Sequence, residues 1–253
     1  MVCCKVIGLV VVNIALVLAG GSGTRFGSGM PKQFVEVLGK PVIVYTLEAL
    51  EASESIDAVC VVCIATHQQL LDELIAHYHL AKVRWTVPGG ASYQESARNG
   101  ICYLRGVAKS DDILMMIMSV QPLISDDIIK DSMAVCMRYG NAVAGTEAIY
   151  NFSPIHDDVW SDSYTLKHGQ MTLNLPWTFP FGYIDEAYQR AEGLGIGMGP
   201  FDYAPTMLID LGEKIYFSKD SSLNQLKITT PNELALFESY LLLRRSRKKG
   251  NRS

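Results

Sequence analysis

Residues 18–33 read Leu-Ala-Gly-Gly-Ser-Gly-Thr-Arg-Phe-Gly-Ser-Gly-Met-Pro-Lys-Gln and directly follow an apolar run, Asn13–Leu18, that predicts a buried first strand. Glycines let the backbone approach an anion closely, and successive N–H groups can form an anion-binding concavity. Arg25 and Lys32 add two cations. The stretch is not a dinucleotide fingerprint, because the third glycine would fall on Phe26, and it lacks the Gly-Lys-Ser/Thr of a P-loop. It predicts a polyphosphate-binding loop; the alternative is a tight strand–helix turn with solvent-facing cations.

Strand-like and helical patterns alternate along the rest of the chain. Apolar runs predict further strands at 58–64, 84–87, 113–118, 142–144 and 214–217. Apolar spacing and capping residues predict helices at 42–52, 68–78, 96–104, 127–139, 182–193 and 231–243. Because the strands are apolar on both faces, the expected fold class is α/β, a mostly parallel sheet with helices on both faces.

Residues 145–180 interrupt this alternation and predict a β-arm that projects from the sheet. The expected organisation is therefore an N-terminal extension at 1–12, one domain at 13–243 with the arm at about 145–180, and a basic, disordered tail at 244–253.

Composition limits the classes of function. The 253 residues are 49% hydrophobic and 19% charged, which excludes a disordered or fibrous protein. The formal charge is −4, but six basic residues lie after residue 243; without them 16 basic residues stand against 26 acidic ones, a charge of −10. Such an acidic body is a poor general binder of nucleic acid, which needs a broad basic face.

The N-terminal 21 residues are largely apolar and resemble a signal peptide or membrane anchor. Asn13 interrupts the run, and the run continues directly into the glycine loop that a folded domain would use. A spanning helix needs about 20 unbroken apolar residues. We therefore expect a cytoplasmic protein with no membrane segment.

Six cysteines show no small-domain spacing. Cys60 and Cys63 form a Cys-x-x-Cys pattern within the predicted strand at 58–64. Residues i and i+3 of a strand point to opposite faces, so these two thiols cannot share a metal or a disulfide there. Reduced thiols are consistent with a cytoplasmic protein.

Two further segments could contact a nucleotide. Gly89-Gly90 followed by Ser96 at a helix start could bind a base edge through backbone groups and a hydroxyl, or could be only a turn and a cap. Lys227, in Gln-Leu-Lys-Ile-Thr-Thr-Pro at 225–231, places a cation beside a helix N-terminus, which is a favourable phosphate site. A purely structural role for this lysine is the alternative.

Together these motifs resemble the CTP-dependent polyol-phosphate cytidylyltransferases, which include the 2-C-methyl-D-erythritol 4-phosphate and ribitol-5-phosphate enzymes. The resemblance runs from about Asn13 to Leu242, and the Ala-Gly-Gly-x-Gly-x-Arg-x-Gly-x-x-x-Pro-Lys-Gln-Phe pattern at 19–34 is highly specific. It implies a Rossmann-like nucleotidyltransferase fold and a homodimer joined by the arm. It also implies cytidylyl transfer from CTP to a polyol phosphate, with Mg²⁺ and release of pyrophosphate.

The resemblance also assigns roles to matching residues. Arg25, Lys32 and Lys227 would stabilise charge on the reacting phosphates and the departing pyrophosphate. Base contacts would come from Gly89, Gly90 and Ser96. The nucleotide would be held by the loop residues Ala19, Gly20, Gly21, Ser22, Gly23 and Thr24. In-line attack of one phosphate on another needs positioning and cations more than covalent help.

The chain departs from the family pattern at the metal and acceptor positions. Met118 stands where the family has a metal-binding aspartate, and Gln121 replaces an arginine. Asn224 occupies a usually acidic or polar position. His168 aligns with the arginine for the acceptor phosphate, whereas Asp202 is kept.

Three explanations follow from these departures. The chain is an active enzyme with a different acceptor and Mg²⁺ held mainly by CTP, or it recruits another acid such as Asp202 or Asp220, or it binds nucleotide without turnover. We favour the first, with a ribitol 5-phosphate-like acceptor over methylerythritol phosphate. A sugar-1-phosphate nucleotidyltransferase is a further alternative, against which the late Lys-Ile-Thr-Thr-Pro motif argues.

Overall fold

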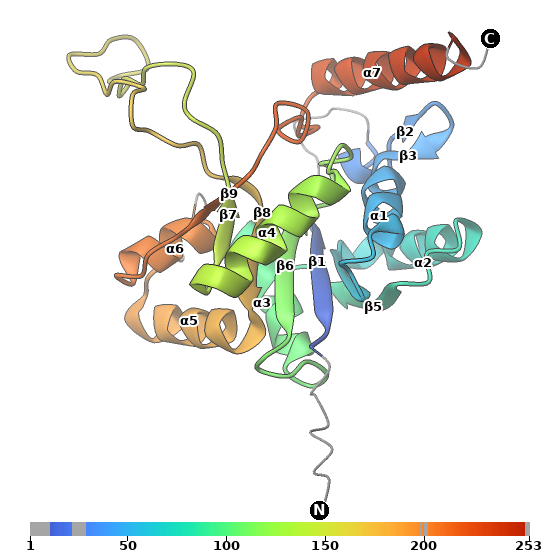
Figure 1. The fold of residues 1–253 in the computed structure, drawn as a ribbon, viewed down its shortest axis with the longest axis horizontal. Coiled ribbons are helices and arrows are strands. Elements are labelled where there is room, and N and C mark those ends of the chain that lie inside the picture. Colours follow the sequence, from blue (N-terminus) through green and yellow to red (C-terminus); the bar gives the residue numbers. More distant parts are fainter. Residues whose placement is uncertain (1–10, 22–28, 198, 200–201, 251–253) are drawn as a thin grey trace, which may run out of the picture.

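The protein is described by a computed structural model (Figure 1), which covers residues 11–21, 29–197, 199 and 202–250, the last three by their backbone alone. No helix in these ranges is both long enough and apolar enough to span a bilayer.

A seven-stranded sheet forms the centre of the molecule. Its order is β5-β4-β1-β6-β8-β7-β9, with parallel pairing throughout except on both sides of β8. This confirms the predicted mostly parallel sheet. The strands are β1 (Asn13–Ala19), β4 (Ala58–Cys63), β5 (Val83–Pro88), β6 (Ile113–Met118), β7 (Ala142–Ala144), β8 (Asn174–Pro180) and β9 (Phe217–Ser218).

Helices cover both faces of the sheet and create two apolar cores. The helices are α1 (Val42–Ala52), α2 (Gln68–His77), α3 (Tyr93–Leu104), α4 (Asp126–Tyr139), α5 (Phe181–Leu194), α6 (Ala204–Asp210) and α7 (Pro231–Gly250). Alternate residues of the central strands point into opposite cores, as the pleat requires. Helices α3, α5, α6 and α7 close one core, and α1, α2 and α4 close the other.

The strand prediction for the Cys-x-x-Cys pair is confirmed. Cys60 packs in one core and Cys63 in the core on the other face of β4, and both are free thiols. Burial raises the pKa of Cys60 to about 12 and that of Cys63 to about 11, because the low-dielectric core disfavours the thiolate.

Two predicted boundaries are wrong. Residues 244–250 continue α7 instead of forming a disordered tail, because a helix already anchored at Phe237 propagates at little cost through Arg and Lys, which are good helix formers. Residues 174–180, assigned to the arm, form β8 inside the main sheet, with five consecutive buried residues. The sequence analysis did not predict α6, because a helix of seven residues is too short to show a clear helical period of apolar residues.

The arm proper comprises residues 145–173 and projects at the upper left of Figure 1. Sparse antiparallel bridges hold it together, among them Phe152 with Thr165 and His156 with Trp160. Large apolar side chains are exposed along most of its length, such as Val159 at 83% and Tyr150 at 73%. Such a surface is typical of a segment that docks on another molecule.

Candidate nucleotide site

A cavity of about 500 Å³ opens at the carboxyl ends of β1, β4, β5 and β6. Ligands of open α/β sheets bind at this edge, because the loops there follow consecutive parallel strands. The cavity is lined by residues from seven segments: Leu18, Ala19, Gly20, Gly21, Lys32, Gln33, Ile64, Gly90, Ala91, Ser92, Tyr93, Ser96, Met118, Ser119, Val120, Tyr203 and Lys227. It thus brings together the three motifs that the sequence placed far apart.

The first two motifs meet at Gly20 and Ser96. A Cβ on Gly20 would lie 2.5 Å from the Ser96 hydroxyl oxygen, so only glycine fits there without displacement. That hydroxyl accepts a hydrogen bond from the Gly90 N–H at 3.1 Å and donates one to the Ser92 carbonyl at 2.9 Å. Gly89 packs against Gly20, where a Cβ would be 3.1 Å from the Gly20 Cα, and does not line the cavity. It therefore sets the spacing of the loops rather than offering a direct base contact.

Gln33 fixes the two ends of the glycine loop and was not assigned a role from the sequence. Its side chain is buried, and Nε2 donates to the carbonyl oxygens of Ala19 at 2.7 Å and Gly21 at 3.1 Å. Because Gln33 follows Lys32 in the same 3-10 turn, these bonds also tie the lysine to the loop. The signal that could have identified Gln33 was its place inside the motif at residues 19–34.

The charge of the cavity suits a polyanion. Lys32 and Lys227 both line it, and no Asp or Glu does among the described residues. The amino terminus of α3, at Tyr93, adds N–H groups and the positive end of a helix dipole. Arg25, Ser22, Gly23 and Thr24 lie outside the described residues.

The described residues do not form a site in which the protein itself holds Mg²⁺. Met118, only 8% exposed, lines the cavity at the end of β6 with a thioether where a carboxylate would be needed. Within the described ranges, no group of three or more His, Cys, Asp or Glu side chains is placed to bind a metal.

The two acids considered as replacements are engaged elsewhere. Asp220 accepts hydrogen bonds from the Ser221 N–H and from the side-chain amides of Asn224 and Gln225, which fold the 220–225 turn. Asn224 is fully buried and also donates to the Leu175 carbonyl at 2.7 Å, so it braces this turn against β8. Asp202 accepts from the Gly199 N–H at 2.6 Å. None of the three lines the cavity.

An aromatic wall on one side of the cavity was missed from the sequence. Tyr93 and Tyr203 meet edge to face with ring centroids 4.9 Å apart, and the buried Trp177 packs beneath both. The Tyr93 hydroxyl is buried without a hydrogen-bond partner among the described residues, and burial raises its pKa well above the ordinary value. Because these three residues are far apart in the chain, no local sequence pattern predicts that they form one wall.

His168 lies on the exposed arm, outside the cavity of its own chain. The structure therefore does not bring this predicted acceptor residue together with Lys32 and Lys227.

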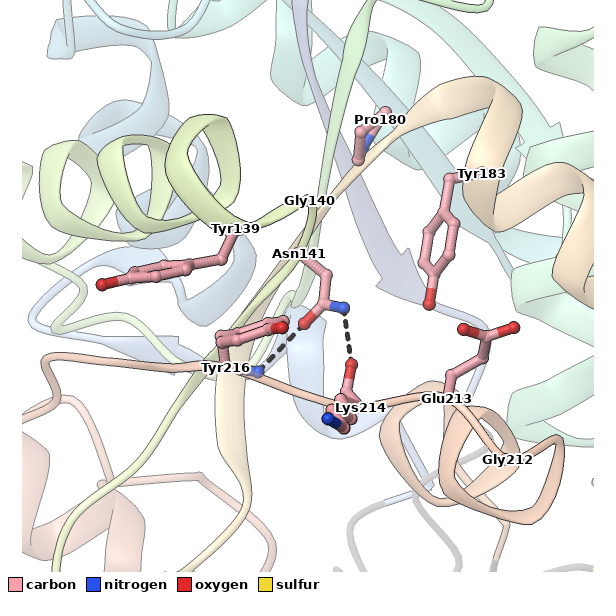
Figure 2. Close-up of a pocket in the computed structure, with 9 residues that line it drawn as sticks. All are labelled: Tyr139, Gly140, Asn141, Pro180, Tyr183, Gly212, Glu213, Lys214 and Tyr216. Carbon is pink, nitrogen blue, oxygen red and sulfur yellow. Dashed lines mark hydrogen bonds between the residues drawn. The ribbon is translucent and has the colours of Figure 1, made fainter.

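A second cavity, of about 450 Å³, lies at the opposite end of the sheet between α4, α5 and the 212–216 segment (Figure 2). The Asn141 side chain donates to the Lys214 carbonyl and accepts from the Tyr216 N–H, so its amide is occupied in holding the wall. Tyr139 stacks on Tyr216 with ring centroids 4.9 Å apart. No predicted site residue lines this second cavity, whereas Lys32, Lys227 and Ser96 line the first, which is therefore the candidate site.

Comparison with known proteins agrees with the geometry. A family profile described as IspD, 2-C-methyl-D-erythritol 4-phosphate cytidylyltransferase, matches residues 13–243. A ribitol-5-phosphate cytidylyltransferase of Lacticaseibacillus paracasei is 34% identical over 227 residues, covering 90% of this chain and 97% of the relative. A 2-C-methyl-D-erythritol 4-phosphate cytidylyltransferase of Syntrophus aciditrophicus is 32% identical over 235 residues, covering 90% and 95%.

The fold recurs in solved structures. The crystal structure of the 4-diphosphocytidyl-2C-methyl-D-erythritol synthase of Anaerococcus prevotii superposes with a TM-score of 0.75, over 92% of this chain and 99% of that one, at 17% identity. The Rossmann-like nucleotidyltransferase fold expected from the resemblance is thereby confirmed. On the evidence of the profile and of relatives matched over nearly their whole length, this chain belongs to the 2-C-methyl-D-erythritol 4-phosphate cytidylyltransferase family of nucleotidyltransferases.

Proposed function

We propose that this enzyme transfers the cytidylyl group of CTP to a polyol phosphate and releases pyrophosphate. The observation that carries the proposal is the convergence of Gly20, Gly21, Lys32 and Lys227 on one cavity whose described lining contains no carboxylate. The two lysines would neutralise the triphosphate and the charge that develops on the leaving pyrophosphate. Fixed cations of this kind act mainly in the transition state, where the charge is concentrated.

The Ser96 hydroxyl and the loop at Gly90 would face the cytosine end of CTP. Ser96 lies in the first turn of α3 and Gly90 in the loop before it, and both line the cavity. Ser96 is 3% exposed and bonded to the loop backbone, which fixes the position of the loop before the nucleotide binds. Preorganisation of this kind lowers the entropic cost of binding.

We further propose a ribitol 5-phosphate-like acceptor and Mg²⁺ that enters bound to CTP. The relatives include a ribitol-5-phosphate cytidylyltransferase at 34% identity over nearly its full length. Mg²⁺ commonly keeps several waters and uses substrate phosphates as ligands, so the absence of a carboxylate from the described lining is compatible with a metal that comes with CTP.

The exposed apolar arm supports a homodimer. In such a dimer, His168 would bind the acceptor phosphate in the partner's cavity. We propose that the homodimer acts in the cytoplasm on CTP and a polyol phosphate. We expect neither a nucleic acid nor a membrane as a binding partner.

Pyrophosphate release tests the proposal. Each of the four nucleoside triphosphates is supplied with Mg²⁺ and ribitol 5-phosphate, glycerol 3-phosphate, methylerythritol 4-phosphate or a sugar 1-phosphate. We expect release with CTP and a polyol phosphate only. Lys32→Ala should lower the rate at least ~10²-fold, the usual loss for one transition-state donor. A near-normal rate in that variant would refute the assignment.

Nucleotide binding without turnover is the second candidate, and Met118 at the family's metal position favours it. It predicts CTP binding with no pyrophosphate from any acceptor in the panel. The same assay therefore separates the two functions.

A further inference from the structure

The outer face of α7 is apolar and uncovered. Leu234, Phe237 and Leu241 pack on the core, and Phe237 meets Tyr45 of α1 edge to face. On the opposite face, Leu236 is 61% exposed and Leu243 is 48% exposed. Leu236, Tyr240 and Leu243 follow the i, i+4, i+7 spacing, so they form one stripe along the helix.

This stripe leads into a strongly basic helix end. Arg244, Arg245 and Arg247 are exposed, and Lys248 and Lys249 follow them in the same helix. No acidic residue follows Glu238. Like charges four residues apart repel each other, although the helix dipole favours cations at a carboxyl end. A negatively charged partner would remove this repulsion. The basic end also lies beyond residue 243, where the family match stops.

The tip of the arm is acidic and apolar, which complements the basic end and the apolar stripe of α7. Residues 155–164 contain Asp157, Asp158 and Asp162 and no Lys or Arg. Asp157 and Asp158 both adopt positive φ, which holds the two carboxylates on a tight turn. Beside them, Val159 is 83% exposed and Trp160 is 50% exposed. The tip therefore offers an apolar anchor surrounded by negative charge.

The arm and α7 rise from the same end of the molecule but lie apart within one chain (Figure 1). The exposures above show that neither covers the other. In a two-fold dimer in which one arm reached the other chain's helix, symmetry would repeat the contact, giving two equal contacts.

We infer that the acidic tip of the arm docks on the outer face of α7 in a second copy of this chain, with Val159 and Trp160 against the Leu236–Tyr240–Leu243 stripe and the aspartates facing Arg244 and Arg247. This contact rests on the homodimer of the proposed function and specifies which surfaces form it. It gives the basic end of α7 a role in self-association.

Charge reversal tests the contact in the full-length protein. The arm variant Asp157→Lys/Asp158→Lys/Asp162→Lys makes both surfaces positive, and the helix variant Arg244→Glu/Arg247→Glu makes the facing side chains of both surfaces negative. Sedimentation velocity at low ionic strength (about 50 mM salt) should show each homodimer weakened by about 10- to 100-fold. Reversal of the exposed Asp72 and Glu73 on α2 serves as the control and should leave the dimer intact.

Mixing the two variants provides the decisive result. Each arm then meets a helix of opposite charge, so we expect a heterodimer with close to wild-type affinity. A helix variant that remains fully dimeric, a mixture that fails to associate, or a monomeric wild-type chain would each overturn the inference. Vesicle binding by the basic end with an unchanged dimer would overturn it too. None of the reversed residues lines the nucleotide cavity, so CTP binding by the same variants reports separately on the proposed function.

Discussion

Replacing Gly20 by alanine tests the contact between the first two motifs. The new Cβ would lie 2.5 Å from Ser96 Oγ and 3.3 Å from Ser96 Cβ, so the serine must move. Its hydroxyl then loses good geometry with the Gly90 N–H and the Ser92 carbonyl. We expect Gly20→Ala to destabilise the fold and to weaken CTP binding together, because one displacement affects both.

The magnitude follows from the two hydrogen bonds. Each contributes about 1 kcal/mol, so their loss lowers the free energy of unfolding by about 2 kcal/mol. If the displaced loop at Gly90 must be restored before CTP binds, the same energy raises the Kd of CTP about 30-fold. Gly21→Ala is the control for the fold, because no atom of the described residues lies within 4 Å of the Cβ that it adds.

A double-mutant cycle with Ser96→Ala makes the test sharper. Ser96→Ala removes the hydroxyl that collides with the new methyl group, so the double variant should be no less stable than the worse single variant. Urea unfolding would then give a coupling energy of about 1–2 kcal/mol between the two sites. Additive effects, or a Gly20→Ala protein as stable as Gly21→Ala, would show that the described contact between the loops is wrong.

Three further substitutions test other parts of the structure. Glu233 accepts hydrogen bonds from the Thr230 hydroxyl and N–H at the start of α7, and these bonds lower its pKa. Its stabilising effect is present above the ordinary glutamate pKa of about 4.3 and is lost as pH falls through the lower folded value. Glu233→Gln should therefore cost about 0.5–1 kcal/mol near pH 7 and progressively less as the pH falls below about 4.3, measured by urea unfolding. Gly100→Ala adds a Cβ 2.6 Å from a core leucine carbon and should cost about 1–3 kcal/mol, whereas Gly193→Ala, with open space around it, should be neutral or stabilising in thermal melts. Met118→Asp should lower the Mg²⁺ concentration that gives half-maximal pyrophosphate release, and an unchanged concentration would mean that the metal lies away from the end of β6.

The sequence predicted the central sheet well because its strands carry a strong local signal. β1, β4 and β6 are continuous apolar runs that are buried on both faces, and the helices between them show clear apolar periods. The glycine loop, the Gly90–Ser96 segment and Lys227 were each predicted from local motifs, and the structure places Gly20, Gly21, Lys32, Gly90, Ser96 and Lys227 at one cavity.

The remaining features depend on contacts between residues distant in sequence. Gln33 acts through carbonyl oxygens of the opposite loop end, and the wall of Tyr93, Tyr203 and Trp177 assembles three separate segments. A local sequence pattern does not show which distant segments of the chain come into contact in the fold. The helical continuation of α7 was missed for another reason: its basic composition resembles a disordered tail, whereas anchoring at Phe237 permits a helix.

Calorimetric titration of CTP with Mg²⁺ into the folded protein tests the central claim most directly. We predict single-site heat with the wild-type chain and with Lys109→Ala, an exposed lysine at the other end of the sheet, and at least ~10-fold weaker binding with Lys32→Ala. Absence of heat from the wild-type protein, or equal affinity in the two lysine variants, would contradict the assignment of this cavity to the nucleotide.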